Sequence, residues 1–168
     1  MNTPTDTIFA GHLVGGPYER VFFEPGEELQ YIRNYIDFLD GEVEYDFRIA
    51  EYFDLRVVGL RSPRGHVSLV AIRGEDRAKL PGFIQDTKIL FVVDSIEAVY
   101  SKAKEVGIPI LQPRTENIMG AQGRLEFAPG YIVELAEATN ESLFHPDVEA
   151  MGLPASRVAS IATADGEF

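Results

Sequence analysis

The chain has 168 residues, enough for one domain of ordinary size with its own hydrophobic core. Hydrophobic residues make up 45% of it and charged residues 25%, values that are typical of globular proteins and exclude a disordered or fibrous chain. Acidic residues outnumber basic ones by 27 to 15, a formal charge of −12 without a basic cluster, so we expect no nucleic-acid partner.

The sequence also lacks the signals of membrane insertion and secretion. No apolar run approaches the roughly 20 residues that a membrane span requires. A secretory signal carries Lys or Arg before its apolar stretch, and the N-terminal segment MNTPTDTIFAGHL has neither there. Cysteine is absent, which excludes disulfides, thiolate metal sites and a cysteine nucleophile. We therefore expect a cytoplasmic protein that has no membrane partner.

The first predicted unit, residues 19–73, follows an N-terminal arm of residues 1–18 in which an edge strand is expected at 8–14. Residues 19–24 alternate as a strand does. A helix is predicted next, because Leu29, Ile32, Ile36 and Leu39 recur at spacings of three, four and three. Gly41 then suits a left-handed C-terminal cap. The unit closes with extended segments rich in β-branched and aromatic residues, at 42–50, 55–61 and 66–72.

The same order of elements returns after a linker at residues 74–87, which is rich in charge, Pro and Gly. In the second unit, residues 88–137, a strand at 88–93 precedes a helix with Ile96, Val99, Ala103 and Val106 at the same spacings and Gly107 as its cap. Extended segments follow at 108–112, 123–127 and 131–136, and residues 138–168 form a C-terminal extension. The chain thus reads β-α-β-β-β twice, at an offset of about 67 residues, as from Leu29 to Ile96.

Short motifs lie in register with this repeat. The second unit has VVD at 92–94 before its helix, a Gly after the helix, and PG at 129–130 running into IVEL at 132–135. It resembles the C-terminal half of the vicinal oxygen chelate superfamily, which contains glyoxalases, bleomycin-resistance proteins and extradiol dioxygenases. Residues 35–39 of the first unit resemble the family more faintly. The resemblance implies an α+β fold in which two βαβββ modules form one cup-shaped mixed β-sheet around a ligand, usually in a homodimer.

Active members of that family commonly hold a divalent metal on four side chains from the first and last strands of each module. They are typically His or Gln on the first strand and Glu on the last. Side chains alternate along a strand, and Arg20 and Lys88 each lie seven residues before the expected start of a helix, at Glu27 and Ser95. The matching positions here are therefore Arg20, Ser68 (or His66), Lys88 and Glu134. Glu134 alone is an ordinary ligand, since a guanidinium has no lone pair and a lysine is protonated near neutral pH. We therefore expect neither a metal nor another cofactor.

Arg20, Lys88 and Glu134 are instead predicted to meet at the floor of the cup, and two interpretations remain open. They form a salt-bridged cluster whose Coulomb gain and desolvation cost nearly cancel, or their unpaired positive charge receives an anionic ligand group. Further residues are expected to line the ligand site from the strands and the pocket mouth: Phe22, Tyr45, Phe47, His66, Ser68, Leu90, Gln112, Gln122 and Arg124.

Two classes of function follow, and the sequence does not decide whether the protein is an enzyme. The first is a metal-independent protein, like bleomycin-resistance members, that binds a small, anionic and partly apolar or aromatic molecule. The second is a metal-independent isomerase, lyase or cyclase with Glu134 as base and Arg20 and Lys88 as oxyanion stabilisers. A carboxylate held between cations is a weak base, which favours binding. A metal-dependent glyoxalase or dioxygenase ranks third, because it needs ligands beyond His66 and Glu134.

Overall fold

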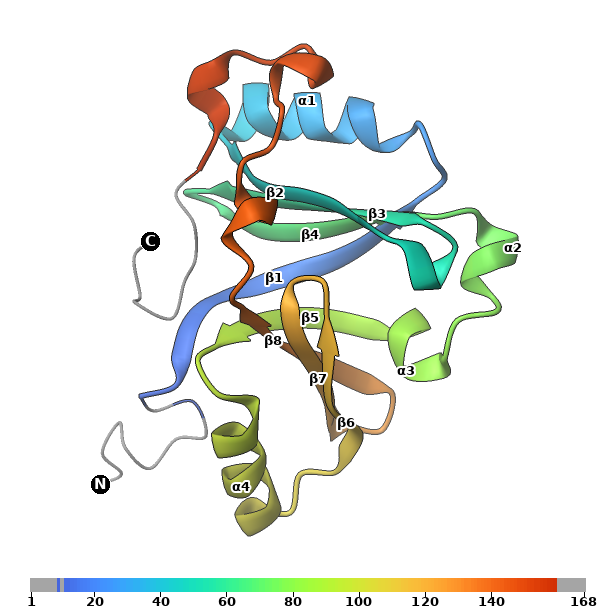
Figure 1. The fold of residues 1–168 in the computed structure, drawn as a ribbon, viewed down its shortest axis with the longest axis vertical. Helices are drawn as coiled ribbons and strands as arrows, with labels where there is room; N and C mark the ends of the chain where they lie inside the picture. Colours follow the sequence, from blue (N-terminus) through green and yellow to red (C-terminus); the bar gives the residue numbers. More distant parts are fainter. Residues whose placement is uncertain (1–8, 10, 160–168) are drawn as a thin grey trace.

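The structure, a computed structural model, describes residue 9 and residues 11–159. These residues form an eight-stranded sheet with a long helix at each end (Figure 1). The first module contains β1 (Leu13–Phe23), α1 (Glu28–Leu39), β2 (Glu42–Ile49), β3 (Leu55–Ser62) and β4 (Gly65–Ala71). The second module contains β5 (Thr87–Val93), α4 (Ile96–Val106), β6 (Ile110–Asn117), β7 (Gly120–Ala128) and β8 (Tyr131–Ala138).

The order of strands repeats in space as it does along the chain. Across the sheet the order is β2-β3-β4-β1-β5-β8-β7-β6. In each module the first and last strands pair in parallel, and the antiparallel pair of β1 and β5 joins the two modules. Read outwards from this joint, both halves have the same strand order. The predicted α+β fold, with two βαβββ modules in one curled mixed sheet, is confirmed.

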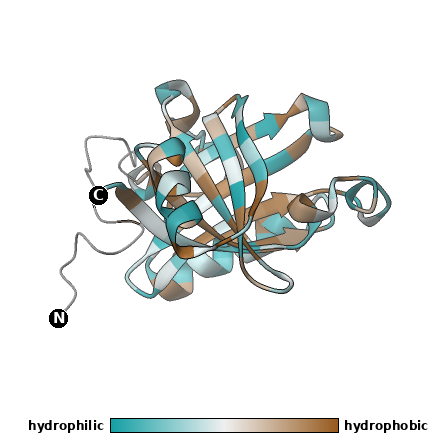
Figure 2. Ribbon diagram, turned by 90° about the horizontal axis from the view of Figure 1, so that it is seen from below, coloured by the Kyte–Doolittle hydropathy of each residue, from teal (hydrophilic) through white to brown (hydrophobic). Residues whose placement is uncertain are grey.

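Strand alternation separates the apolar residues into cores on the two faces of the sheet. Ile32 and Ile36 of α1 pack with Val58 of β3 on one face, and α4 packs with Leu135 of β8 in the same way in the second module. Brown and teal segments alternate along the curled strands in Figure 2. The opposite face carries a third apolar cluster, which lines the inside of the cup and includes Phe47, Val57, Leu90 and Phe144.

The two long helices end in different ways. Gly107 takes the left-handed conformation after α4, with φ 82°, as predicted. After α1 it is Asp40, with φ 56°, that does so, and the predicted cap at Gly41 is wrong. Gly41 meets a different requirement, because a Cβ atom there would lie 2.5 Å from the ring of Tyr35.

The first strand begins earlier than predicted. β1 starts at Leu13, so residues 13 and 14 belong to a central strand and not to the expected edge strand, whose residues 8 and 10 lie outside the described part of the chain. The stretch Gly15-Gly16-Pro17 concealed this strand because those residue types signal turns. The pairing with β5 shifts its register on both sides of Gly15.

The second module also has longer strands than predicted at its outer side. β6 and β7 form a hairpin that extends to Asn117 and Gly120, where a loop between residues 112 and 123 was expected. Pro113 and the polar residues that follow it gave no strand signal, and they are tolerated because β6 is the last strand of the sheet.

The described parts of the linker and of the C-terminal extension, and the connection between β2 and β3, contain short helical turns. The linker contains the single-turn helices α2 (Gly74–Arg77) and α3 (Gly82–Gln85), and residues 50–52 form η2 (Ala50–Tyr52). The C-terminal extension contains the short 3-10 helices η3 (Glu141–Phe144), η4 (Glu149–Met151) and η5 (Ala155–Arg157). It runs past β2 towards α1 (Figure 1), and Val158 forms an isolated bridge with Val43. Within the described residues, no helix has the length and apolar content needed to cross a membrane.

The C-terminal extension contributes to the core inside the cup. The ring of Phe144 is 2% exposed and meets the ring of Tyr45 edge-on at 5.5 Å between centroids. We expect Phe144→Ala to lower the free energy of unfolding by about 3–5 kcal/mol, because it removes a buried aromatic ring and leaves a cavity. Urea unfolding followed by circular dichroism measures this.

The matched control is Phe38→Ala on α1, where the ring is 90% exposed. This change should alter the free energy of unfolding by no more than about 0.5 kcal/mol. Equal effects of the two substitutions would contradict the packing of the C-terminal extension described above.

Candidate functional site

A small cavity, here called the cup cavity, lies on the inner face of the sheet between the modules. Its volume is about 40 Å³, which is room for about three water molecules. Side chains from both modules line it, and they divide into an apolar and a polar set. The apolar set includes Phe22, Phe47, Val57, Leu90 and Met119. The polar set is Arg20, Ser68, Asn117, Gln122, Arg124 and Glu134.

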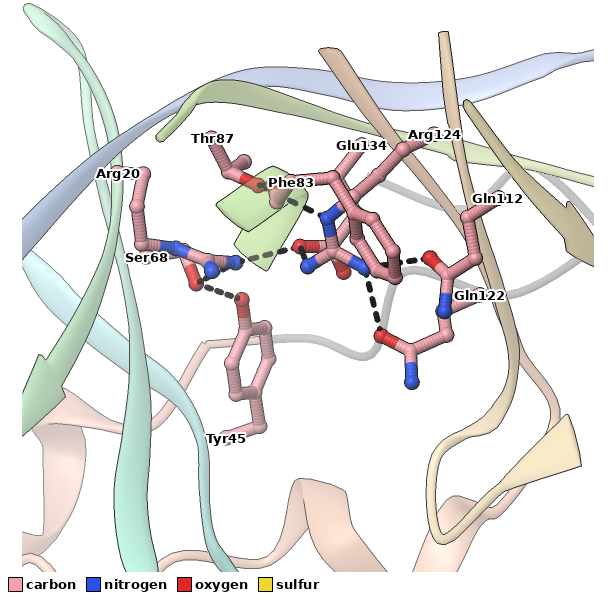
Figure 3. Close-up of polar contacts among 9 residues, drawn as sticks. All are labelled: Arg20, Tyr45, Ser68, Phe83, Thr87, Gln112, Gln122, Arg124 and Glu134. Atoms are coloured by element: carbon pink, nitrogen blue, oxygen red, sulfur yellow. Dashed lines mark hydrogen bonds and ion pairs between the residues drawn. The ribbon is translucent and has the colours of Figure 1, made fainter. Parts of the chain in front are cut away.

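Three charged side chains, here called the charge cluster, meet at the wall of this cavity (Figure 3). Oε1 of Glu134 accepts a hydrogen bond from Nη2 of Arg20 at 2.9 Å and another from Nη2 of Arg124 at 2.8 Å. The side chains of Arg20, Arg124 and Glu134 are 6%, 2% and 8% exposed. Two buried guanidiniums therefore share one carboxylate, and the charge cluster has a net charge of +1.

Each nitrogen atom of the Arg124 guanidinium donates at least one hydrogen bond. Its Nε donates to Oγ1 of Thr87 at 2.8 Å, and its Nη1 donates to the amide oxygens of Gln112 and Gln122 at 2.7 and 2.9 Å. Arg124 lies directly opposite Glu134 in the pairing of β7 with β8. Burial lowers the pKa of the Arg124 guanidinium and Glu134 opposes this change, but an arginine does not lose its proton in a protein. Arg124 is thus a fixed positive charge.

Arg20 is less completely paired. Besides Glu134, its Nη2 has only a long contact of 3.4 Å with Oγ of Ser68 among the described residues, and its Nε is buried without a hydrogen-bond partner there. Ser68 lies opposite Arg20 in the parallel pair of β1 and β4, and it accepts a hydrogen bond from the hydroxyl of Tyr45 at 3.1 Å. Burial raises the pKa of Tyr45, so this hydroxyl stays protonated.

Of the predicted cluster, the structure brings Arg20 and Glu134 together but leaves Lys88 exposed and outside the cup cavity. The prediction that Lys88 faces the cup is wrong. It rested on counting back from the helices, and residues 24–27 join β1 to α1 whereas residues 94 and 95 alone join β5 to α4. Strand pairing identifies Leu90 as the counterpart of Arg20, since Arg20 pairs with Ser68 and Leu90 with Glu134.

A shift of register in the pairing of β5 with β8 contributes to this difference. It falls between Thr87 and Ile89, and it leaves Thr87 buried against Arg124 while Lys88 is exposed. The second cation of the cluster is Arg124, which the sequence predicted as a ligand-binding residue and not as a partner of Glu134.

The remaining predicted residues divide into three groups. Phe22, Phe47, Ser68, Leu90, Gln122 and Arg124 line the cup cavity. Tyr45 and Gln112 stand behind that lining and hold Ser68 and Arg124. His66 does not line the cavity: its ring packs on Tyr18 at 5.2 Å, it borders a separate surface pocket, and burial lowers its pKa. The expectation that His66 lines the ligand site is therefore wrong.

Among the described residues, sequence reasoning missed two further buried acids, Glu28 and Glu44. Glu44 is fully buried on β2, where it accepts hydrogen bonds from the hydroxyl of Tyr18 and from Nη1 of Arg61. Burial raises the pKa of Glu44. The signal was an acidic residue between two apolar positions of a strand, Val43 and Tyr45, in a segment where a register shift places it inward.

The residues at the superfamily's metal positions do not fit a divalent cation. By strand pairing these positions are Arg20, Ser68, Leu90 and Glu134. They provide one carboxylate, whose Oε1 is taken by two guanidiniums, and a bound cation would meet their positive charges. In the part of the chain that the structure describes, no three His, Cys, Asp or Glu side chains lie close enough together to hold a metal ion.

Comparison with known proteins supports the fold. No family model matches the sequence, and no curated protein matches it. Among solved structures, methylmalonyl-CoA epimerase from Mycobacterium tuberculosis is similar with a TM-score of 0.57 and 16% identity, over 87% of this chain and 99% of that one. An uncharacterized protein from Methanosarcina mazei has a TM-score of 0.57 and 14% identity, over 75% and 94%.

A hypothetical protein from Bacillus halodurans gives a TM-score of 0.55 and 18% identity, over 73% of this chain and 92% of that one. At these identities the likeness shows the fold alone, which is the vicinal oxygen chelate fold.

The charge cluster predicts a strong dependence of stability on Glu134. Glu134→Ala leaves Arg20 and Arg124 adjacent and uncompensated, so we expect the free energy of unfolding to fall by about 3–5 kcal/mol. Urea unfolding at low ionic strength measures this. Glu116→Ala, the same change at an exposed position of β6, should have an effect within about 0.5 kcal/mol. A loss at Glu134 no larger than that at Glu116 would show that solvent compensates the two guanidiniums.

Proposed function

We propose that this chain is a metal-independent member of the vicinal oxygen chelate superfamily that binds a small, anionic and partly apolar or aromatic molecule in the cup cavity. The two-module fold and the motifs at the repeat support the assignment to the superfamily. The observation that carries the proposed function is the buried charge imbalance, in which Arg20 and Arg124 share the single carboxylate of Glu134.

The sign of the buried charge favours an anionic ligand. A net positive charge out of contact with bulk water is unfavourable unless a counter-ion or hydrogen-bond acceptors compensate it. A carboxylate on the ligand neutralises the cluster and forms charge-assisted hydrogen bonds with a guanidinium. A cationic ligand meets repulsion from both arginines, and a purely apolar ligand leaves the charge uncompensated.

The other walls favour an apolar ligand body. Phe22, Phe47, Val57, Leu90 and Met119 surround the polar part of the cavity, an arrangement of apolar walls with a few polar anchors that is common in small-molecule sites. At about 40 Å³ the cavity holds a single small group such as a carboxylate. A larger ligand requires side-chain rotation, for which Met119 is suited because an unbranched thioether repacks easily.

Catalysis by Glu134 as a base has less support. Both guanidiniums donate to Oε1, so Oε2 alone remains to accept a proton from a substrate. Lys88, the second oxyanion stabiliser of that hypothesis, lies outside the cavity. A metal-dependent glyoxalase or dioxygenase is disfavoured by the donor set at the metal positions. The homodimer that the family resemblance implies stays a prediction.

The proposed function is tested with acetate, propionate and benzoate as probes. After dialysis against a chelator, isothermal titration calorimetry should show that at least one of them binds with one site per chain. Backbone amide shifts in NMR spectra should fall on residues around the cup cavity, such as Val57, Leu90 and Met119. Elemental analysis should find no stoichiometric divalent metal in the purified protein.

Three results would contradict the proposal. None of the three anions binds; or the shifts fall on the outer groove of α1, at residues such as Tyr31 and Phe38; or binding appears only when a divalent metal is added.

A further inference from the structure

We infer that Arg20 and Ser68, and not Arg124, form the subsite for the ligand's head group, and that this subsite selects a singly charged, acceptor-only oxyanion, a carboxylate, over the matching carboxamide. This inference rests on the proposed function and assigns different roles to the two buried arginines. It follows from a count of hydrogen-bond donors and acceptors around the cup cavity.

Arg124 has little capacity left for a ligand. Its three nitrogen atoms all donate, to Thr87, to Gln112 and Gln122, and to Glu134. The ring of Phe83 also lies near its guanidinium, at 5.8 Å from the ring centroid. Turning Arg124 towards a ligand would break several of these hydrogen bonds in a buried place, where each unpaired group is costly. Arg124 is therefore a positioning residue that fixes Glu134 and supplies a constant charge.

Arg20 has more unused donors than Arg124, because its hydrogen bonds to the described residues come from Nη2 alone. Its Nε is buried and has no hydrogen-bond partner among the described residues, although its side chain is 6% exposed and lines the cavity. Buried polar groups in native structures are nearly always hydrogen-bonded, and an exception calls for an explanation such as a bound ligand or water. The atom itself has almost no exposed surface in the present arrangement, so a carboxylate oxygen on the ligand reaches this N–H after the Arg20 side chain shifts towards the cavity.

Ser68 supplies a second donor next to it. Oγ of Ser68 accepts from the hydroxyl of Tyr45 and, at 3.4 Å, from Arg20, but its own hydrogen has no acceptor within residues 11–159. The hydrogen bond from Tyr45 occupies a lone pair of Ser68, which directs the Ser68 hydrogen elsewhere. Because Ser68 and Arg20 are partners across β4 and β1, the two free donors lie on neighbouring strands of the same face.

The acceptors nearby are largely occupied, which sets the chemistry of the head group. Oε1 of Glu134 and the amide oxygen of Gln122 already receive hydrogens from guanidiniums. A carboxylate brings acceptors alone and matches the free donors of Arg20 and Ser68. A carboxamide brings two N–H groups to a place where few acceptors are free among the described side chains that line the cavity, such as Oε2 of Glu134 and the hydroxyl of Tyr52. One negative charge on the ligand also balances the charge cluster. A second negative charge would lie against the apolar walls of the cavity without a counter-charge.

The test uses the side-chain N–H signals of the arginines in the full-length protein. Spectra of Arg20→Lys and Arg124→Lys assign the two Nε–H resonances in ¹H–¹⁵N correlation spectra. Titration of wild type with benzoate should shift the Arg20 Nε–H signal strongly and leave that of Arg124 nearly in place. Benzamide, which has the same shape without the charge, should bind at least about tenfold more weakly, a factor that corresponds to about 1.4 kcal/mol.

A pair of serine variants tests the second donor. Ser68→Ala should weaken benzoate binding by about tenfold, whereas Ser101→Ala, at an exposed position of α4, should leave it unchanged. If Ser68→Ala does not fold, the wild-type resonances and the benzoate-to-benzamide ratio still decide.

The outcomes separate this inference from the proposed function. If benzoate binds in the cup and the Arg124 resonance moves while that of Arg20 does not, the assignment of roles is wrong and the binding function stands. If benzamide binds as tightly as benzoate, Oε2 of Glu134 serves as an acceptor and the selectivity is wrong. If none of acetate, propionate and benzoate binds at all, both proposals fail together.

Discussion

One buried carboxylate connects the two halves of this molecule. Oε1 of Glu134 on β8 receives a hydrogen bond from Arg20 on β1 and another from Arg124 on β7, so a strand of the first module is tied to two strands of the second. The antiparallel pair of β1 and β5 holds the same modules through the backbone. A buried ion pair contributes little net stability, because desolvation offsets the Coulomb attraction, but breaking it is costly. Its effect is to fix where the strands and their side chains lie around the cavity.

The fold could be predicted from the sequence because the spacing of apolar residues is the same in its two repeats. Spacings of three and four residues predicted both long helices, and alternation along the strands placed Arg20 and Glu134 on one face. The prediction was wrong about which residue of β5 occupies the position equivalent to Arg20. Counting from the helix starts assigned Lys88 to the place of Arg20, and the unequal connections before α1 and α4 invalidated that count. Backbone pairing alone shows that Leu90 is the counterpart.

The position of Arg124 depended on information that periodicity does not contain. Arg124 lies opposite Glu134 because a register shift occurs between Glu126 and Ala128, near the turn that joins β7 to β8. An unshifted hairpin would place Leu125 at that position and turn the guanidinium to the other face. Glu44 was missed for a similar reason, since a shift in the pairing of β2 with β3 accompanies its burial. Arg124 and Glu44 thus owe their inward positions to irregular ladders, which periodicity does not reveal.

The C-terminal extension also affects how well the edges of the sheet resist aggregation with other chains. An open sheet ends in two strands whose outer N–H and C=O groups can recruit another chain and start aggregation. At β2 the chain covers part of this side itself, through the bridge between Val158 and Val43 and the hydrogen bond from N of Ala159 to O of Val43. At β6 the protection is chemical, because Pro113 removes a donor and Arg114 and Glu116 place charges there. Removing the segment that contains Val158 and Ala159 would therefore expose a template for aggregation along β2.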